Sequence, residues 1–125
     1  MKILMLGDVM GRAGRDVLSD ELPGLREKLG IDFVLVNGEN SAGGFGITGE
    51  ICRSFYQSGA DAITLGNHAW DQRETASYIE GDAKLLRPAN YPPGTPGRGH
   101  GLFQTADGRK VLVRSEERRV GKECR

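Results

Sequence analysis

The 125-residue chain has few cysteines, few histidines and no long apolar run. Its two cysteines, Cys52 and Cys124, lack the spacing of a metal or redox motif and say nothing about disulfides. Cys52 falls within a predicted helix, where a half-buried thiol is the ordinary state. No apolar run is long enough to span a bilayer, and the amino terminus carries no signal-peptide pattern. We therefore expect one soluble, cytoplasmic domain without a membrane partner.

A basic surface stripe is also missing. The formal net charge is zero, and the last twelve residues hold five basic and three acidic side chains, so the rest of the chain is slightly acidic. Proteins that bind nucleic acid independently of sequence rely on neutralising phosphates, so we expect no stable nucleic-acid complex. Glycine, in contrast, is abundant, with 19 residues that gather at strand ends and in loops. This distribution indicates tight turns or close approach to a ligand.

Over most of the chain, short apolar runs alternate with segments whose apolar residues recur at helical spacing. Strands are predicted at residues 2–6, 31–36, 61–65 and about 84–86, and helices at about 15–28, after Thr48 and at about 71–80. Gly30 is expected to end the first helix, and Thr48 to cap the second. This alternation predicts an α/β fold with a mainly parallel sheet and flanking helices.

The remaining residues have a different character. Proline and glycine exclude regular structure over residues 87–99, and a hairpin is expected with strands at 101–105 and 109–113, joined through Asp107-Gly108. Residues 114–125 lose the apolar pattern and would ordinarily be a charged, solvated tail. Their sequence is similar to the in-frame translation of a common sequencing adapter. We therefore assign residues 1–113 to the domain and 114–125 to a non-native tail with few core contacts.

Three polar clusters follow the first three predicted strands directly. They are Gly7-Asp8, Asn37-Gly38-Glu39-Asn40 and Gly66-Asn67-His68. The carboxyl ends of parallel strands lie along one edge of a sheet, so clusters far apart in sequence should meet there. We predict that five side chains converge on one cavity: Asp8, Glu39, Asn40, Asn67 and His68.

This set of side chains is suited to metal binding. Carboxylate and amide oxygens with an imidazole favour divalent ions such as iron(II) or manganese. A bridging carboxylate, for which Glu39 is the natural candidate, can hold two ions that activate a water and clamp phosphoryl oxygens. Each residue also has an ordinary alternative: Asp8 and His68 as turn or helix-cap residues, and Glu39 and Asn40 as part of a solvated loop.

The three clusters resemble the first three metallophosphoesterase motifs of the calcineurin-like superfamily, in which Gly-Asn-His is the most specific element. Residues 37–48, 64–72 and 85–99 look typical of the YmdB-like branch of bacterial phosphodiesterases. The resemblance covers residues 1–113. It implies the amino-terminal part of a metallophosphoesterase sandwich whose second half is missing.

The resemblance also implies an activity and roles for the five residues. It implies a di-iron hydrolase, with manganese as the alternative metal, that acts on phosphodiesters such as 2′,3′-cyclic nucleotides. Asp8 and Asn40 would bind the first metal and Asn67 the second, while Glu39 would bridge them. His68 would be the catalytic residue that donates a proton to the leaving oxygen.

The chain departs from the superfamily pattern in two ways. Met10 stands where the wider superfamily commonly has a metal-binding histidine, although the YmdB-like branch also lacks that histidine. His68 and His100 are the only histidines, so the metal-binding histidines of the family's second half are absent. We therefore expect this chain alone to be inactive, and exposed apolar surface to make it prone to association as a homo-oligomer.

Two other functions stay open from the sequence. Gly7, Gly11 and Gly14 superficially resemble the glycine-rich loop of a nucleotide-binding module. Asp8 counts against this function, because a carboxylate inside such a loop would repel the pyrophosphate. The third alternative is a non-catalytic interaction domain in which the polar clusters are diverged remnants.

Overall fold

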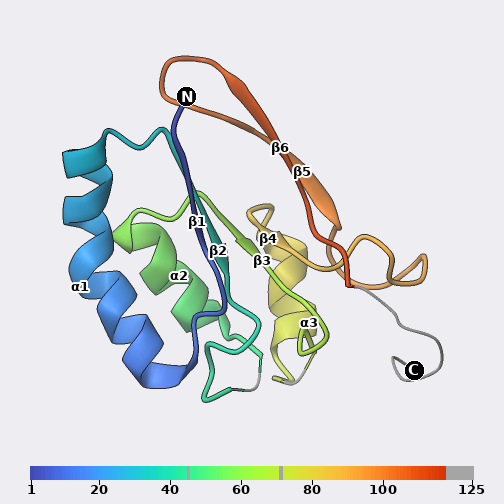
Figure 1. The fold of residues 1–125 in the computed structure, drawn as a ribbon. Coiled ribbons are helices and arrows are strands. Elements are labelled where there is room, and N and C mark those ends of the chain that lie inside the picture. Colours follow the sequence, from blue (N-terminus) through green and yellow to red (C-terminus); the bar gives the residue numbers. More distant parts are fainter. Residues whose placement is uncertain (45, 71, 118–125) are drawn as a thin grey trace.

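A four-stranded parallel sheet forms the centre of the fold. The computed structural model describes residues 1–44, 46–70 and 72–117. The strands are β1 (Ile3–Leu6), β2 (Phe33–Asn37), β3 (Ala62–Thr64) and β4 (Leu85–Leu86), and they lie side by side in sequence order. They are connected by α1 (Gly11–Leu29), α2 (Gly49–Ser58) and α3 (Thr75–Tyr78), with a 3₁₀ turn, η1 (Ile79–Gly81), after α3. The α/β fold with a mainly parallel sheet and flanking helices is confirmed (Figure 1).

The two faces of the sheet are covered differently. Because successive strand residues point to opposite faces, Val34 and Val36 of β2 belong to the core on the helical side, together with Leu22 and Phe55. Phe33, on the opposite face, packs with residues of the carboxyl-terminal hairpin. Figure 1 shows the helices on one side of the sheet and the hairpin on the other.

The hairpin consists of β5 (His100–Gln104) and β6 (Lys110–Arg114), which pair antiparallel as predicted. Gly108 in the connecting turn has φ +90°, a conformation that glycine adopts without steric cost. The Phe103 and Phe33 rings lie 5.6 Å apart and attach the hairpin to the sheet. Leu102 and Leu112 face outward and are largely exposed.

Both predicted caps are confirmed. Gly30 has φ +63° and ends α1 in the left-handed conformation. The Thr48 hydroxyl accepts a hydrogen bond from the Ile51 backbone N–H at 3.2 Å and caps α2. Cys52 in α2 is fully buried rather than half-buried, and this burial raises the pKa of its thiol, with the charge of Asp82 raising it further. Cys124 lies outside the described residues.

Two helix boundaries differ from the prediction. α1 begins at Gly11, about four residues early, because the Gly11 N–H donates to the Asn40 carbonyl instead of requiring a capping side chain. The helix predicted near residues 71–80 is reduced to one α-turn and one 3₁₀ turn, and Asp71 lies outside the described residues. The buried Thr75 hydroxyl donates to the Ile47 carbonyl at 2.6 Å and attaches the start of this short helix to the segment before α2.

Ser115 departs from the expectation that residues after Val113 make few core contacts. β6 continues through Arg114, and Ser115 is only 8% exposed. The Ser115 hydroxyl donates to the Leu65 carbonyl at 2.8 Å, and the Ala89 N–H donates to the Ser115 carbonyl at 2.7 Å. Strand alternation explains the error, because Val113 and Ser115 point inward while charged Arg114 and Glu116 point outward. Residues 118–125 lie outside the described part of the chain.

Truncation should reveal the contribution of this segment to stability. A chain ending at Val113 loses the Ser115 hydrogen bonds and the paired bonds between Asn90 and the Glu117 backbone. We expect its free energy of unfolding to fall by about 2–4 kcal/mol relative to a chain ending at Glu117, since each lost bond contributes about 1 kcal/mol. Urea unfolding of the two chains measures the difference. Equal midpoints would show that the domain ends at Val113 after all.

Among the described residues, no helix is both long and apolar enough to cross a membrane.

Candidate functional site

The three polar clusters lie at the same edge of the sheet. β1 pairs with β2 up to Leu6 and Val36, and β2 pairs with β3 up to Asn37 and Thr64. The chain leaves each strand directly after these pairs. Figure 1 shows the carboxyl ends of β1, β2 and β3 at the same end of the sheet. The segments after these ends carry Asp8, then Glu39 and Asn40, then Asn67 and His68.

The first direct contact joins Asp8 and Asn40. The Asn40 amide nitrogen donates to the Asp8 carboxylate at 2.6 Å, across 32 residues of sequence. Two backbone bonds fix the same juxtaposition, because Val9 donates to the Asn37 carbonyl and Gly11 donates to the Asn40 carbonyl. Rotation of the Asn40 amide about its terminal bond would present its oxygen in place of its nitrogen. A carboxylate and an amide oxygen would then stand side by side.

Asp8 is held in an unusual backbone conformation. It has φ +48° and is the one non-glycine residue with positive φ in the part of the chain that the structure describes. This left-handed region is uncommon for residues with a side chain, although aspartate tolerates it better than most. Strained conformations of this kind concentrate at functional sites, where the surrounding structure maintains them. The strain therefore supports a functional role for Asp8 over that of a simple turn residue.

The second contact joins Glu39 to the turn after β3. The Glu39 carboxylate lies against the Cα atom of Gly66, so closely that a Cβ added there would overlap both carboxylate oxygens. The Asn37 amide donates to Glu39 Oε1 at 3.4 Å, and the His68 backbone N–H donates to Oε2 at 3.5 Å. Both bonds are long. The carboxylate is therefore placed by steric fit to the glycine and remains free to take a stronger partner.

Asn67 and His68 lie on the turn itself. Asn67 is exposed and His68 is half-buried. The Ala69 N–H donates to the Gly66 carbonyl at 3.1 Å and closes the turn around them. Sequence reasoning missed a residue that contacts this turn from outside, Tyr91, because the irregular proline- and glycine-rich segment gives no periodic signal.

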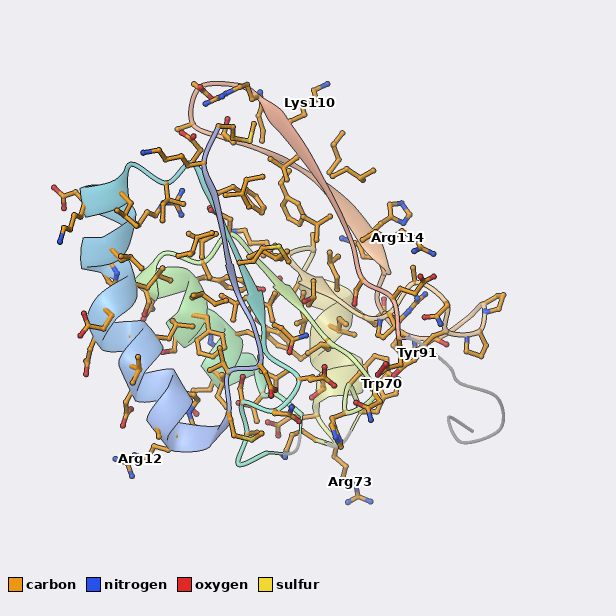
Figure 2. The ribbon with its side chains drawn as sticks, in the orientation of Figure 1. Arg12, Trp70, Arg73, Tyr91, Lys110 and Arg114 are labelled. Carbon is orange, nitrogen blue, oxygen red and sulfur yellow. The ribbon has the colours of Figure 1, made fainter. Side chains whose placement is uncertain are left out.

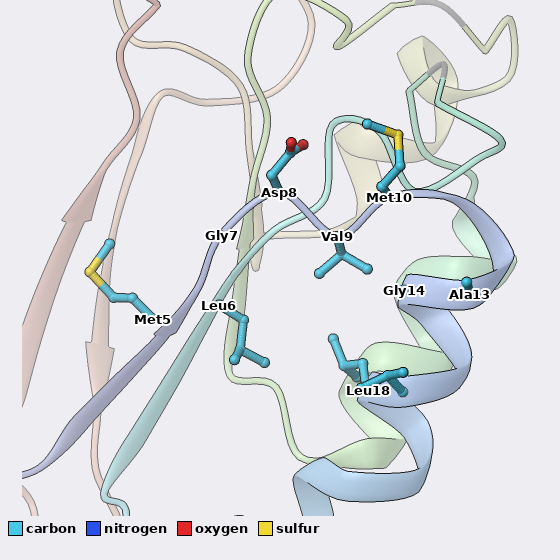
Figure 3. A pocket seen from close by; sticks show the side chains of 10 residues that line it. Met5, Leu6, Gly7, Asp8, Val9, Met10, Ala13, Gly14 and Leu18 are labelled. Carbon is cyan, nitrogen blue, oxygen red and sulfur yellow. The ribbon is translucent and has the colours of Figure 1, made fainter.

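An open pocket of about 560 Å³ borders the edge where Asp8 lies (Figure 3). It is lined mainly by apolar side chains of β1, of α1 and of the loop between them, including Met5, Val9 and Leu18. Figure 3 shows the Asp8 carboxylate pointing away from Leu6, Val9 and Leu18. The other four predicted site residues do not line this pocket. Convergence of all five side chains on one cavity stays a prediction.

The donor set suits a divalent cation only when the amides are included. Within residues 1–44, 46–70 and 72–117, no group of three or more His, Cys, Asp or Glu side chains could hold a metal ion. Two carboxylates, Asp8 and Glu39, lie at the edge with the amides of Asn40 and Asn67. Oxygen donors of this kind fit a hard or borderline ion. The loosely bonded Glu39 carboxylate and the strained Asp8 are consistent with such a ligand.

Replacement of Gly66 by alanine should weaken metal binding while leaving the stability of the fold nearly unchanged. The new Cβ would displace the Glu39 carboxylate, which is the flexible end of a side chain, and the backbone of Gly66 needs no positive φ. We expect the free energy of unfolding to change by less than about 1 kcal/mol. Manganese affinity should fall at least about 10-fold, because a predicted ligand has moved. Calorimetric titration checks the affinity, with Gly81→Ala, where a Cβ meets open space, as the control.

Comparison with known proteins gives one consistent group. The sequence profile of a family described as "YmdB-like protein" matches residues 4–123. A 2′,3′-cyclic-nucleotide 2′-phosphodiesterase of Bacillus subtilis (strain 168) is 47% identical over 113 residues, which are 90% of this chain and 42% of that protein. This chain thus spans less than half the length of that relative.

Two solved structures have the same fold. A hypothetical protein from Thermus thermophilus superposes with a TM-score of 0.81 at 38% identity, covering 90% of this chain and 43% of that chain. A structure described as a novel phosphatase from Mycoplasma pneumoniae also gives a TM-score of 0.81, at 30% identity, covering 91% of this chain and 42% of that chain.

Proposed function

Because this chain belongs to the family of YmdB-like proteins, we propose that it supplies part of the di-metal centre of a phosphodiesterase that hydrolyses phosphodiesters such as 2′,3′-cyclic nucleotides. One observation supports this function most strongly. Asp8 contacts Asn40, and Glu39 contacts the turn of Asn67 and His68, at one edge of the sheet. The name of the Bacillus subtilis relative supports the substrate class.

Each residue has a role in this proposal. Asp8 and Asn40 would hold a first ion, Asn67 would hold a second, and Glu39 would be the carboxylate shared between them. Bound divalent ions, iron or alternatively manganese, would activate a water and neutralise phosphoryl oxygens. His68, at the surface of the same turn, donates a proton to the leaving oxygen.

The chain by itself has few imidazole ligands for such a centre. Its second histidine, His100, is on β5 and borders a different pocket with Lys84 and Arg98, which none of the five predicted site residues lines. Metal binding by this chain alone should therefore be weak, and its turnover close to background. Exposed Met5 in β1 and Val17 in α1 favour association between copies of the chain.

The nucleotide-binding alternative is disfavoured by the backbone of the loop after β1. A phosphate cradle requires free N–H groups at the helix start. The Val9, Gly11 and Gly14 N–H groups instead donate to the carbonyls of Asn37, Asn40 and Met10. Three N–H groups of this segment are therefore already bonded and would not be available to a pyrophosphate.

A chimera tests the proposed function. It joins residues 1–113 to the part of the Bacillus subtilis relative that lies beyond the aligned region. With iron(II) or manganese, the chimera should hydrolyse a 2′,3′-cyclic nucleotide, and the 125-residue chain should not. Metal content is quantified in both proteins. Robust turnover by the chain alone would contradict the expected inactivity, and a folded chimera that neither binds metal nor hydrolyses the substrate would contradict the function.

A further inference from the structure

The turn that carries Asn67 and His68 is held from outside by Tyr91. The Tyr91 hydroxyl donates to the Gly66 carbonyl at 2.9 Å, across 25 residues of sequence. The Tyr91 ring also contacts Trp70, with ring centroids 6.5 Å apart and planes inclined by 47°. Figure 2 shows Trp70 and Tyr91 next to each other at this end of the domain. Tyr91 therefore contacts both ends of the five-residue turn.

The two ends of the turn contact Tyr91, and its middle residues, Asn67 and His68, are predicted site residues. The Gly66 carbonyl accepts from Ala69 within the turn and from Tyr91 outside it. On the other side, the His68 N–H faces the Glu39 carboxylate. The turn is thus bonded at Gly66 by Tyr91 and contacts the predicted bridging carboxylate of Glu39 through His68. A shift of the Gly66 carbonyl would move both side chains relative to Glu39.

Tyr91 is itself held in place by the segment after β6. The preceding residue, Asn90, exchanges two hydrogen bonds with the Glu117 backbone, at 2.5 and 3.0 Å. The Tyr91 N–H donates to the Pro88 carbonyl at 3.3 Å. A backbone fixed in this way allows the hydroxyl to act as a rigid support rather than as a mobile contact.

We propose that Tyr91 is a positioning residue, whose hydroxyl holds the Gly66–Trp70 turn so that Asn67 and His68 face the edge of the sheet where Asp8 and Glu39 lie. The role of this turn in metal binding and catalysis rests on the proposed function. The contact between Tyr91 and Gly66 does not depend on it. Removing a group that does not touch the metal but orients its ligands commonly lowers metal affinity by about 10- to 100-fold.

The chain offers a matched control for this hydroxyl. Ser115 donates to the carbonyl of Leu65, one residue before Gly66 and outside the turn. Tyr91→Phe and Ser115→Ala each remove one hydroxyl and with it one hydrogen bond to a backbone carbonyl, that of Gly66 or of Leu65. If Tyr91 acted only on stability, the two variants would differ only in how far they destabilise the whole domain.

The first experiment measures amide hydrogen exchange in the metal-free 125-residue chain by NMR. Tyr91→Phe should accelerate exchange at His68 and Ala69 at least about 10-fold beyond its effect on global unfolding, and Ser115→Ala should not. Equal acceleration in both variants, no local acceleration in Tyr91→Phe, or a Tyr91→Phe chain that fails to fold would each overturn the positioning role.

The second experiment titrates the same chains with manganese. Tyr91→Phe should weaken manganese binding about 10- to 100-fold with the ring packing retained, whereas Ser115→Ala should weaken it less than about 3-fold. Equal losses in the two variants would overturn the proposal. A wild-type chain that binds manganese too weakly to titrate would agree with the weak binding expected of an incomplete centre, and the exchange measurement would then decide the role of Tyr91.

Discussion

Replacement of His68 by alanine in the chimera should lower kcat for a 2′,3′-cyclic nucleotide by about 10² to 10⁴, the usual contribution of a positioned acid. His68 is half-buried on the turn after β3, and its backbone N–H faces the Glu39 carboxylate. Its imidazole is not one of the predicted metal ligands. Metal content should therefore stay close to that of the unsubstituted chimera, and the loss should fall on kcat rather than on KM.

The other histidine provides the control. His100→Ala removes an exposed imidazole on β5, which borders a pocket that none of the predicted site residues lines. Steady-state kinetics on both variants, with iron and manganese quantified in each, should show a loss only for His68→Ala. Equal activity of the two variants would remove His68 from the mechanism, and a parallel loss of metal would make it a ligand instead.

Replacement of Asp8 by glycine or by alanine should weaken metal binding equally, but only glycine should relieve the backbone strain at this position. Asp8→Gly and Asp8→Ala both remove the carboxylate that contacts Asn40, so both should weaken manganese binding by about 100-fold or more. Only glycine adopts φ +48° without strain. The glycine variant should therefore be more stable than the alanine variant by about 1 kcal/mol.

Calorimetric titration and urea unfolding of the two variants measure these effects on the same samples. Retained manganese binding in either variant would exclude Asp8 as a ligand. A glycine variant less stable than the alanine variant would show that the left-handed conformation of Asp8 costs nothing, and would remove the argument from strain.

Local signals in the sequence account for most of the fold. The apolar runs before Gly7, Asn37 and Gly66 become β1, β2 and β3, and Thr48 and Gly30 act at helix ends as their chemistry predicts. The placement of the polar clusters follows from this topology alone. What parallel pairing cannot give is the orientation of each side chain, which depends on contacts such as that between Glu39 and Gly66.

The predictions differ from the structure where a residue bonds a group that is distant in the sequence. The start of α1 is satisfied by the Asn40 carbonyl, and the helix after Trp70 is shortened where Thr75 bonds Ile47. The inward position of Ser115, which bonds Leu65, is hidden by the charged residues on either side of it. Each of these partners lies 28 or more residues away in the sequence, so no local window contains both groups.

The strand order has a consequence for synthesis of the protein. Each strand of the sheet pairs with the one before it in sequence, so the sheet can assemble progressively as the chain leaves the ribosome. All five predicted site residues precede Ala69, whereas Tyr91, whose hydroxyl bonds the Gly66 carbonyl, is translated later. The edge of the sheet would therefore form before the turn carrying His68 is secured, and a nascent chain would present its predicted metal ligands before they are held in their final geometry.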